Sequence, residues 1–388
     1  MTPIVKPGLE VLLAEGATSL RGRRVGLITN PTGVTSDLTP NVVALLAAGV
    51  KIVALFGPEH GFDSSVQDAL AVDGGRDAAT GLTIFSLYGA TEKPTPDMLA
   101  GLDVLLFDVQ DAGVRFYTYP WTLALCMTAA AEAGIPVVVL DRPNPIRGDV
   151  CEGPVLEAGF ESFVGMYRVP LRYGLTVGEL AGLLNQEFGI GADLTVVRMR
   201  GWRRGMWYAD TGLPWVQPSP NLPALDTTIV YPGTCLVEGT TLSEGRGTTK
   251  PFEVVGAPWL DGTRLAAILH VRGLPGVRFR AAAFTPTFDK FSGELCRGLQ
   301  VHVTDRASFR SVETGLHLVA AAQEVAPRDF AWRPALGDDR LHFDLLIGND
   351  WVRQALDAGE PVPDVVARWA SDLECWRNLR TRYFLYDV

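Results

Sequence analysis

The sequence lacks the short motifs by which many enzymes are identified. No GxGxxG follows the first apolar run and no GxxxxGK[ST] occurs, so the common dinucleotide- and phosphate-binding fingerprints are missing. There is also no HExxH and no close group of histidines and cysteines of the kind that binds zinc. We therefore expect neither a cofactor nor a metal ion.

Cysteine is scarce, and its five positions are widely spaced with no CxxC: Cys126, Cys151, Cys235, Cys296 and Cys375. An odd number without paired spacing predicts free thiols in a reducing compartment rather than a disulfide framework. The sequence also lacks an uninterrupted run of about 18 apolar residues and an N-terminal basic segment followed by an apolar one. These absences predict a cytoplasmic protein with no signal peptide and no membrane partner.

Positive charge is in the minority. The chain has 34 Lys and Arg residues against 44 Asp and Glu residues, which gives a net charge of −10. Such an excess of negative charge disfavours nucleic acid as a partner. The 388 residues, 47% of them hydrophobic, are enough for about two domains with ordinary cores.

Short apolar runs alternate with helical patterns in the N-terminal half. The runs are "RRVGLITN", "KIVALF", "DVLLFDVQDAG" and "PVVVLDRPNPI". Strands that are apolar on both faces are typical of parallel sheets, and the helices between them predict right-handed βαβ units. The predicted fold class is therefore α/β, with a doubly wound parallel sheet.

A different mixture of strand and helix patterns follows residue 225. Strands are predicted in "VRFRAAAFTPTF" and "LQVHVTD", and the closing "RYFLYDV" is predicted as a further strand. We expect a second, smaller α/β domain, so that the chain divides into residues 1–225 and 226–388.

Polar residues follow all four apolar runs of the first half. Ligands of open α/β sheets bind beyond the carboxyl ends of the strands, so we expect these side chains to converge on one site. In chain order they are Asn30, Glu59, His60, Asp108, Asp111, Arg115, Tyr117, Asp141, Arg142 and Asn144. His60 is the only histidine at a predicted strand end, and the other four, His342 among them, are expected to be structural or surface residues.

Paired carboxylates without a metal suit glycoside hydrolysis, in which a carboxylic acid protonates the departing oxygen. Glu59 fits this acid, because burial at a strand end favours the uncharged carboxyl group. The neighbouring Gly57 and Gly61 allow the backbone to approach a ligand closely. His60 is placed to hydrogen-bond Glu59 or the sugar.

The sequence offers two candidates for the second catalytic group, Asp108 and Glu152. The polar, glycine-rich stretch "EGTTLSEGRGTTKPFE" adds Glu244 and Arg246 as candidate substrate-binding residues. Arg246 lies between two glycines, where its planar guanidinium could bind a carboxylate.

Two other functions fit the same residues. A sugar-binding protein without catalysis would also have two α/β domains around a cleft. A metal-dependent phosphoryl-transfer enzyme could use Asp108 and Asp141 to hold Mg²⁺. Loss of turnover on Glu59→Gln would exclude the first alternative, and insensitivity to chelators would exclude the second.

A series of motifs along the chain is characteristic as an ordered set: "FGPEHGF", "DVQDAGVRFYTY", "VLDRPNPI", "PSPNLP" and "YPGTCLVEGTTLSEGRGTTKPFE". Over nearly the whole chain the sequence resembles the exo-acting β-N-acetylmuramidases of the NamZ type. The resemblance implies a Rossmann-like catalytic domain, a C-terminal auxiliary domain and a cleft between them, with no metal or nucleotide. It also implies release of terminal N-acetylmuramic acid from the non-reducing ends of peptidoglycan fragments, and the missing export signal would suit cell-wall recycling.

The resemblance further implies roles for single residues. Glu59, in the Glu-His motif, is the implied acid. Implied substrate contacts are Arg115, Tyr117, Asp141, Arg142, Glu152, Glu244 and Arg246. N-acetylmuramic acid carries a lactyl carboxylate, and we expect Arg115, Arg142 or Arg246 to bind it. Its 2-acetamido group could also act as an internal nucleophile, with Glu152 or Asp108 orienting the amide.

Overall fold

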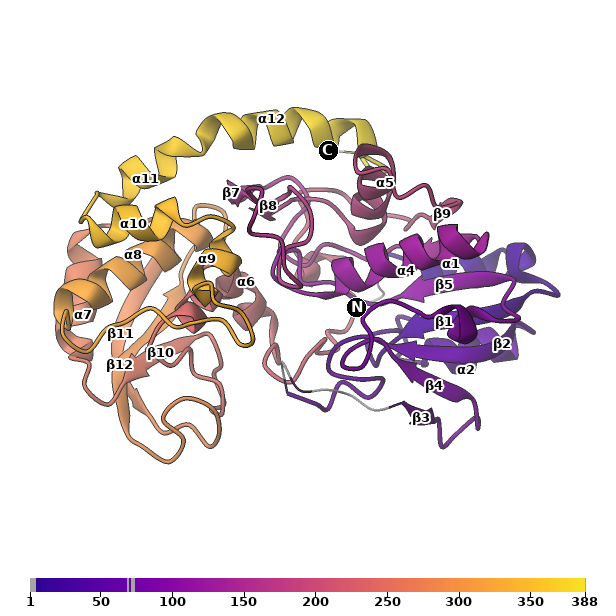
Figure 1. The fold of residues 1–388 in the computed structure, drawn as a ribbon, viewed down its shortest axis with the longest axis horizontal. Helices are drawn as coiled ribbons and strands as arrows, with labels where there is room; N and C mark the ends of the chain where they lie inside the picture. Colours follow the sequence, from indigo (N-terminus) through magenta and orange to yellow (C-terminus); the bar gives the residue numbers. More distant parts are fainter. Residues whose placement is uncertain (1–4, 68–69, 71–73, 388) are drawn as a thin grey trace.

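The computed structural model describes residues 5–67, 70 and 74–387, which form two lobes (Figure 1). The first lobe is built on a seven-stranded sheet of order β3-β4-β2-β1-β5-β6-β9, in which only the pairing of the edge strand β3 is antiparallel. The strands are β1 (Arg24–Thr29), β2 (Lys51–Gly57), β3 (Gly75–Arg76), β4 (Thr83–Ser86), β5 (Val104–Asp108), β6 (Val137–Leu140) and β9 (Leu194–Val197).

The six parallel strands, counted along the chain, lie in the order 3-2-1-4-5-6 across the sheet. This is the Rossmann order, so the predicted Rossmann-like, doubly wound sheet is confirmed. The order reverses between β1 and β5, where Thr29 lies beside Asp108. All four predicted apolar runs are strands of this sheet.

Alternate residues of the strands pack against opposite helix layers. Val104 and Leu106 of β5 belong to a hydrophobic cluster with α1 and α2, whereas Leu105 and Phe107 belong to the cluster that contains α4 and α5. Burial on both faces explains why these strands are apolar throughout. The helices of this lobe are α1 (Gly8–Ala14), α2 (Asn41–Ala47), α3 (Pro96–Leu99), α4 (Tyr119–Ala133) and α5 (Val177–Glu187).

The second lobe packs helices on a small antiparallel sheet of order β10-β12-β11. Gly233 in α6 and Gly315 in α8 let these two helices touch, because a Cβ atom on Gly233 would lie 1.8 Å from the carbonyl oxygen of Ser311. The elements are α6 (Leu225–Thr234), β10 (Val254–Ala257), α7 (Gly262–Val271), β11 (Val277–Phe284), β12 (Cys296–Val303), α8 (Ser311–Val325), α9 (His342–Ile347), α10 (Trp351–Asp357) and α11 (Val362–Arg368).

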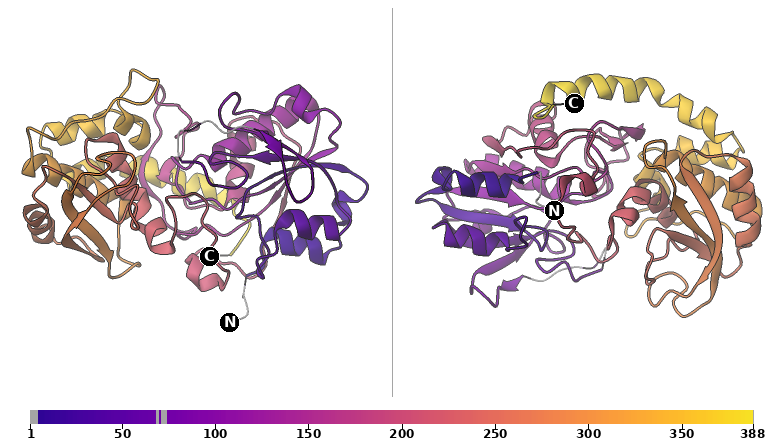
Figure 2. Two further views of the ribbon diagram at one scale, coloured as in Figure 1. Left: turned by 90° about the horizontal axis from the view of Figure 1, so that it is seen from below. Right: turned by 180° about the vertical axis from the view of Figure 1, so that it is seen from behind.

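A buried arginine and a long helix connect the lobes. Arg115 donates hydrogen bonds to the carbonyl oxygens of Pro154 (3.0 Å) and Val169 (2.9 Å), in and beside the hairpin of β7 (Glu152–Val155) and β8 (Pro170–Arg172). It donates another to that of Leu346 (2.8 Å) in α9. Helix α12 (Ala370–Arg380) runs from the second lobe back over the first (Figures 1 and 2). The relative position of the lobes is therefore held from both sides.

The predicted strand in "RYFLYDV" is wrong. The segment forms a short 3₁₀ turn, η4 (Thr381–Tyr383), and then an irregular stretch that packs on the first lobe. No strand pairs with it in the part of the chain that the structure describes: the Tyr386 hydroxyl donates to Asp141 (2.5 Å), the Leu385 amide donates to Glu179 (2.7 Å), and the Asp387 carbonyl accepts from the Arg204 amide (3.3 Å).

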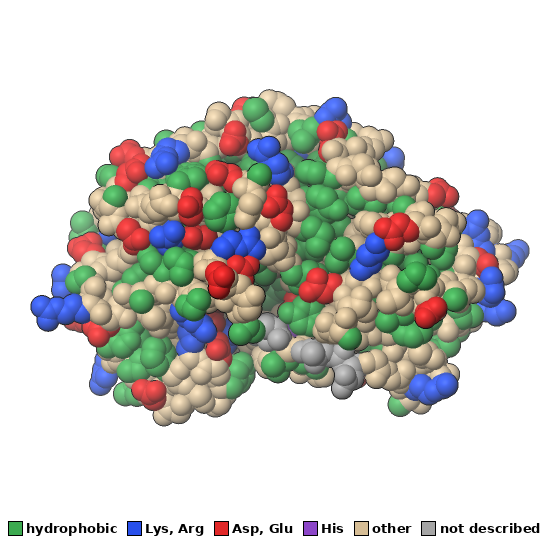
Figure 3. Space-filling model, viewed as in Figure 1, with side chains coloured by type: hydrophobic (Ala, Val, Ile, Leu, Met, Phe, Trp, Pro, Cys, Tyr) green, Lys and Arg blue, Asp and Glu red, His purple; other side chains and the backbone are tan. Residues whose placement is uncertain are grey.

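The surface carries acidic and basic side chains side by side, and no large area of one sign is visible on the face drawn in Figure 3. That face is hollowed where the two lobes meet. Among the residues that the structure describes, no helix is both long and apolar enough to span a bilayer.

Candidate active site

A cavity of about 160 Å³ lies between the two lobes. The first lobe contributes side chains around the end of β2 and the start of α4, and the second contributes side chains from α6, the following turn and α9. The cavity is lined by Glu59, His60, Tyr88, Phe116, Tyr117, Thr118, Phe163, Val164, Ser219, Asn221, Leu222, Tyr231, Cys235, Glu238, Arg246, Phe252, His342 and Leu346. Of the residues predicted from the sequence, Glu59, His60, Tyr117 and Arg246 are brought together here.

A tight turn after β2 presents Glu59 to this cavity. The Gly61 amide donates to the Pro58 carbonyl (3.0 Å), and His60 and Gly61 both take positive φ values, 67° and 83°. A Cβ atom at Gly57 would lie 2.8 Å from the amide nitrogen of Phe62, so the turn requires glycine at the strand end. The two glycines around Glu59 thus serve the turn that exposes the carboxyl group to the cavity.

The carboxyl group of Glu59 is buried and held in place. The Thr118 hydroxyl, at the start of α4, donates a hydrogen bond of 2.6 Å to Oε2 of Glu59. A buried carboxyl group held by the Thr118 hydroxyl, with a cavity in front of it, is positioned to exchange a proton with a bound ligand.

His60 is buried beside Glu59, and its Nδ1 atom lies 2.9 Å from the carbonyl oxygen of Val66. A carbonyl can only accept, so Nδ1 carries the hydrogen, and Nε2 of the neutral ring is an acceptor. Burial lowers the pKa of His60, although the charge of Glu59 opposes this. The ring also meets Tyr119 edge-on, with centroids 6.5 Å apart.

Aromatic rings from both lobes form one wall of the cavity. Phe116 of the first lobe meets Tyr231 of the second edge-to-face at a centroid distance of 5.1 Å, and Tyr231 meets Phe252 in the same way at 4.7 Å. Tyr117 also contacts Tyr231, at 6.2 Å. An apolar wall with a few fixed polar groups is typical of a small-molecule site.

A cluster of charged side chains of the second lobe lies beside this wall, with the Arg246 guanidinium 5.1 Å from the centre of the Phe252 ring. Nη2 of Arg246 contacts Oε1 of Glu238 at 2.6 Å, and its Nε contacts Glu244 at 3.2 Å. Lys290 contacts the other oxygen of Glu244 at 3.0 Å, and Nε2 of His342 lies 3.6 Å from Glu238. Glu238, Arg246 and His342 line the cavity, whereas Glu244 lies behind them and does not. Burial raises the pKa of Glu244.

Asp108 and Arg142 do not line the cavity, contrary to the sequence-based expectation. They form a buried bidentate ion pair, with N–O distances of 2.6 and 3.0 Å, and Asn41 donates a further hydrogen bond of 2.8 Å to Asp108. Arg142 also donates to the Val34 carbonyl. The carboxylate at the end of β5 therefore fixes neighbouring loops of the first lobe.

Asp141 is likewise a structural carboxylate. It accepts hydrogen bonds from the Thr176 hydroxyl (2.7 Å), the Gly178 amide (2.8 Å) and the Tyr386 hydroxyl, so it joins the first turn of α5 to the C-terminal segment. Burial raises its pKa to about 7. Asp108 and Asp141 both bond to Arg142, through its side chain and its amide respectively, and neither lines the cavity. The phosphoryl-transfer alternative therefore has no assembled site among the described residues.

The remaining strand-end residues point into the protein. The Tyr173 hydroxyl donates to Asp111, and burial raises the pKa of that carboxyl group to about 6. Asn30 donates to the Tyr119 hydroxyl (3.0 Å), and Asn144 donates to a backbone carbonyl before α5 (2.8 Å). Asn30 therefore supports the ring beside His60 and does not itself face the cavity.

Glu152 and Arg115 serve the contact between the lobes. Glu152 pairs with Arg172 at 2.5 Å and accepts from the Val312 amide at the start of α8 (3.2 Å). Arg115 binds three carbonyl groups, and burial lowers its pKa to about 9. Neither lines the cavity that contains Glu59.

No role in the site was predicted from the sequence for Thr118, Glu238 or His342, which are among the polar residues of this cavity. Thr118 lies in "RFYTYP" and Glu238 in "CLVEGTT", both within motifs used for the family resemblance. His342 was expected to be a structural or surface residue, but it lines the cavity and faces Glu238. No local pattern distinguished it, because α9 reaches the cavity only through the packing of the lobes.

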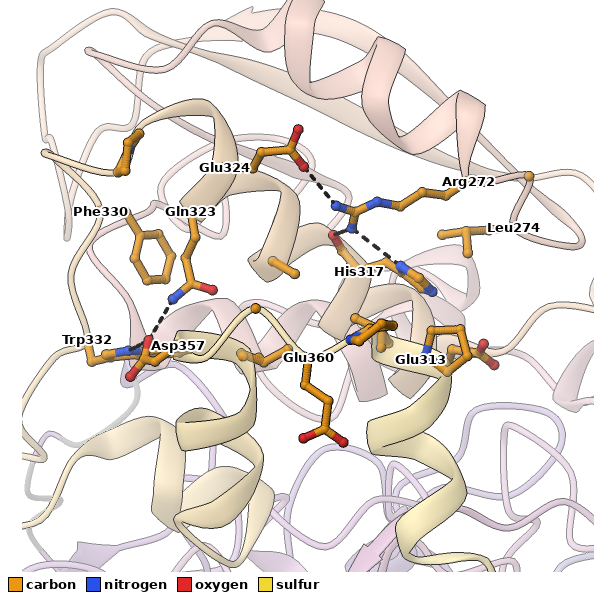
Figure 4. A pocket seen from close by; sticks show the side chains of 18 of the residues that line it. Arg272, Leu274, Glu313, His317, Gln323, Glu324, Phe330, Trp332, Asp357 and Glu360 are labelled. Carbon is orange, nitrogen blue, oxygen red and sulfur yellow. Dashed lines mark hydrogen bonds and ion pairs between the residues drawn. The ribbon is translucent and has the colours of Figure 1, made fainter.

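A larger groove, of about 980 Å³, lies on the second lobe between α7, α8 and α11 (Figure 4). Its polar side chains pair with one another: Arg272 with Glu324 at 3.2 Å, and Trp332 with Asp357 at 2.9 Å. It contains none of the predicted site residues. The smaller cavity between the lobes is therefore the candidate active site.

A Rossmann-like lobe, a second lobe that closes a cavity, and two carboxyl groups facing that cavity from opposite lobes define a two-domain α/β enzyme of the glycosidase type. The family models agree with this class. The model for the N-terminal part of the exo-β-N-acetylmuramidase NamZ matches residues 25–226, and the model for its C-terminal part matches residues 229–386. The chain belongs to the NamZ family of exo-β-N-acetylmuramidases, which are glycosidases.

Individual relatives support the assignment. The chain is 49% identical over 385 residues to the peptidoglycan β-N-acetylmuramidase NamZ of Bacillus subtilis (strain 168), an alignment that covers 99% of this chain and 92% of the relative. Two crystal structures of DUF1343-family proteins from Bacteroides fragilis are similar. The first has a TM-score of 0.90 and 38% sequence identity over the whole of both chains. The second has a TM-score of 0.80 and 31% sequence identity over 99% of each chain. The resemblance stated from the sequence is thus confirmed.

Proposed function

We propose that this chain is an exo-β-N-acetylmuramidase that releases terminal N-acetylmuramic acid from the non-reducing ends of peptidoglycan fragments, with Glu59 as the general acid. The observation that supports this most directly is the position of Glu59, buried at the cavity between the lobes and held by Thr118. The activity named for the Bacillus subtilis relative supports the choice of substrate.

The proposed reaction is a hydrolysis whose proton passes through Glu59. The protonated carboxyl group gives its proton to the glycosidic oxygen as the bond to the anomeric carbon breaks and the electron pair leaves with that oxygen. Water then supplies hydroxide to the anomeric carbon, and its remaining proton returns to the Glu59 carboxylate. No oxidant, reductant or other co-reactant is consumed.

The size of the cavity supports attack at a chain end. Its volume of about 160 Å³ is smaller than the roughly 300–1,000 Å³ of most small-molecule sites, and residues of both lobes line it. It thus suits the end of a glycan better than several consecutive sugars.

Of the three candidate arginines, Arg246 lines the cavity and the other two do not. We therefore assign to Arg246 the binding of the substrate's lactyl carboxylate. Replacement by lysine keeps the charge but loses the planar pair of donors. We expect Arg246→Lys to raise KM about tenfold or more for a muraminide, the scale of one lost charged hydrogen bond. The increase for the matching N-acetylglucosaminide, which has no lactyl group, should be much smaller. Equal increases for both substrates would reject the assignment.

The substrate assignment is tested with the purified chain and two chromogenic glycosides. We expect rapid release of the chromophore from a β-N-acetylmuraminide and at least about tenfold lower kcat/KM on the β-N-acetylglucosaminide, because the latter lacks one charged contact. Turnover of neither compound, together with binding of N-acetylmuramic acid, would favour the sugar-binding alternative. Faster cleavage of the glucosaminide would show that the assigned substrate is wrong.

We further propose that the enzyme works on imported fragments in the cytoplasm, in the recycling of cell wall. All five cysteines are unpaired and four are buried, which suits a reducing compartment. Cell fractionation, with detection of the protein in the cytosol or in the medium, tests this part of the proposal.

A further inference from the structure

Glu238 faces the same cavity as Glu59 but comes from the other lobe. It lies in the 3₁₀ turn η3 (Cys235–Gly239) that follows α6, and its side chain is 15% exposed. Glu59 and Glu238 are the only carboxyl side chains among the described residues that line the cavity. Each lobe therefore contributes one acidic side chain to the lining of the cavity.

The surroundings of Glu238 favour its ionised form. Arg246 contacts its Oε1 at 2.6 Å, and His342 lies 3.6 Å from its Oε2. Burial alone would raise the pKa of Glu238, but Arg246 and His342 more than compensate and lower it. Lys290 adds a positive charge near the Glu238 backbone carbonyl (3.1 Å), whereas Glu244 adds a negative charge behind Arg246.

The other carboxyl groups near the cavity are less suitable. Glu244 is buried behind Arg246 and Lys290 and does not reach the cavity. Partial burial and the nearby charge of Glu59 raise the pKa of Glu92, but this residue is largely exposed and does not line the cavity. The candidates from the sequence, Asp108 and Glu152, are bound within other contacts.

Cleavage of a glycosidic bond needs an acid on the side of the departing oxygen and negative charge near the sugar ring, where positive charge develops. We infer that Glu238 is the second catalytic group, the anion that stabilises the developing positive charge at the anomeric centre while Glu59 donates its proton. The inference rests on the proposed glycosidase function and deepens it. His342 is then a positioning residue for Glu238, since it acts through the Glu238 carboxylate, and Arg246 holds that carboxylate in addition to the substrate contact assigned to it above.

The test compares Glu238→Gln with Glu92→Gln on the chromogenic muraminide. Glu238→Gln keeps an oxygen that can accept a hydrogen bond from Arg246 but removes the negative charge. We therefore expect kcat to fall at least about 100-fold, which is the effect of losing one electrostatic stabiliser of the transition state. KM should change little. Glu92→Gln should retain kcat within about threefold, because an exposed charge is screened by solvent. Thermal unfolding of both variants shows whether they are folded.

A second variant distinguishes catalysis from a structural ion pair. Glu238→Ala leaves space beside Arg246. If an anion is needed at that position, added formate should raise the activity of this variant at least about tenfold. In His342→Gln the acidic limb of the kcat/KM profile should move to higher pH, because Glu238 loses a group that lowers its pKa.

The outcomes separate this inference from the proposed function. If the wild-type chain hydrolyses the muraminide but folded Glu238→Gln keeps more than a tenth of its kcat, the role of Glu238 is wrong and the glycosidase assignment stands. If the acidic limb of the pH profile is unchanged in His342→Gln and formate does not rescue Glu238→Ala, the proposed role of Glu238 is likewise wrong. If the wild-type chain hydrolyses no glycoside, both proposals fall together.

Discussion

Glu59→Gln is expected to lower kcat by roughly 10²–10⁴-fold, the range that one general acid contributes, and to leave KM nearly unchanged. Glutamine has nearly the same shape, and its amide oxygen can still accept the hydrogen bond from Thr118. What it lacks is a proton that it can donate. The measurement is steady-state kinetics on muraminides whose leaving groups differ in basicity.

The leaving group makes this experiment specific for an acid. A sugar or a weakly acidic phenol departs only with a proton, so the kcat for its cleavage should fall by the whole factor expected for the loss of the general acid. A strongly acidic nitrophenol departs as an anion, so its release should be affected far less. An equal loss for both leaving groups would contradict the role of Glu59 as proton donor.

Glu152→Gln provides the matched control. Glu152 is also a buried glutamate, and the sequence had made it a candidate for catalysis. Its carboxylate binds Arg172 and the amide of Val312, away from the cavity. The folded variant should therefore keep most of its turnover at a temperature well below its unfolding midpoint. A loss comparable with that of Glu59→Gln would return Glu152 to the list of catalytic groups.

The sheet was predictable because its signal is local. Strands such as β5 are covered by helices on both faces, so the β5 residues from Val104 to Phe107 are all apolar and the run is visible in the sequence. The Rossmann order could be inferred only through the family resemblance, since several strand orders fit the same runs. "RYFLYDV" is rich in aromatic residues, which are common in strands, but its polar groups bond to Asp141 and Glu179 of the first lobe. Only the folded structure shows that these bonds take the place of strand pairing.

The site was harder to predict because a polar residue at a strand end has two uses. Glu59 faces a cavity, whereas Asp108 and Asp141 satisfy buried donors of the protein itself. Both uses leave the same residue types in the same pattern, since buried polar groups must be paired wherever they occur. Glu238 and His342 lie about 180 and 280 residues after Glu59, so only the contact between the lobes reveals that they share its cavity.

Arg142→Met is expected to lower the free energy of unfolding by about 3–5 kcal/mol, because it leaves the charge of Asp108 buried without its partner. Asp108 is completely buried, and after the change only Asn41 and nearby backbone remain beside it. Although burial alone would lower it, the pKa of Arg142 is raised by Asp108, which shows how closely the two charges interact. Urea unfolding followed by fluorescence measures the loss.

Two controls show that this loss comes from a stranded charge and not from the removal of an arginine. Arg24→Met breaks an exposed ion pair with Asp103, which solvent screens, so the unfolding midpoint should barely move. The double variant Asp108→Leu/Arg142→Met removes both buried charges and should regain much of the lost stability. If that double variant also hydrolyses the muraminide at a rate close to that of the unaltered chain, Asp108 has no part in the chemistry. If it folds but is inactive, Asp108 takes part after all, and its pairing with Arg142 must open when substrate binds.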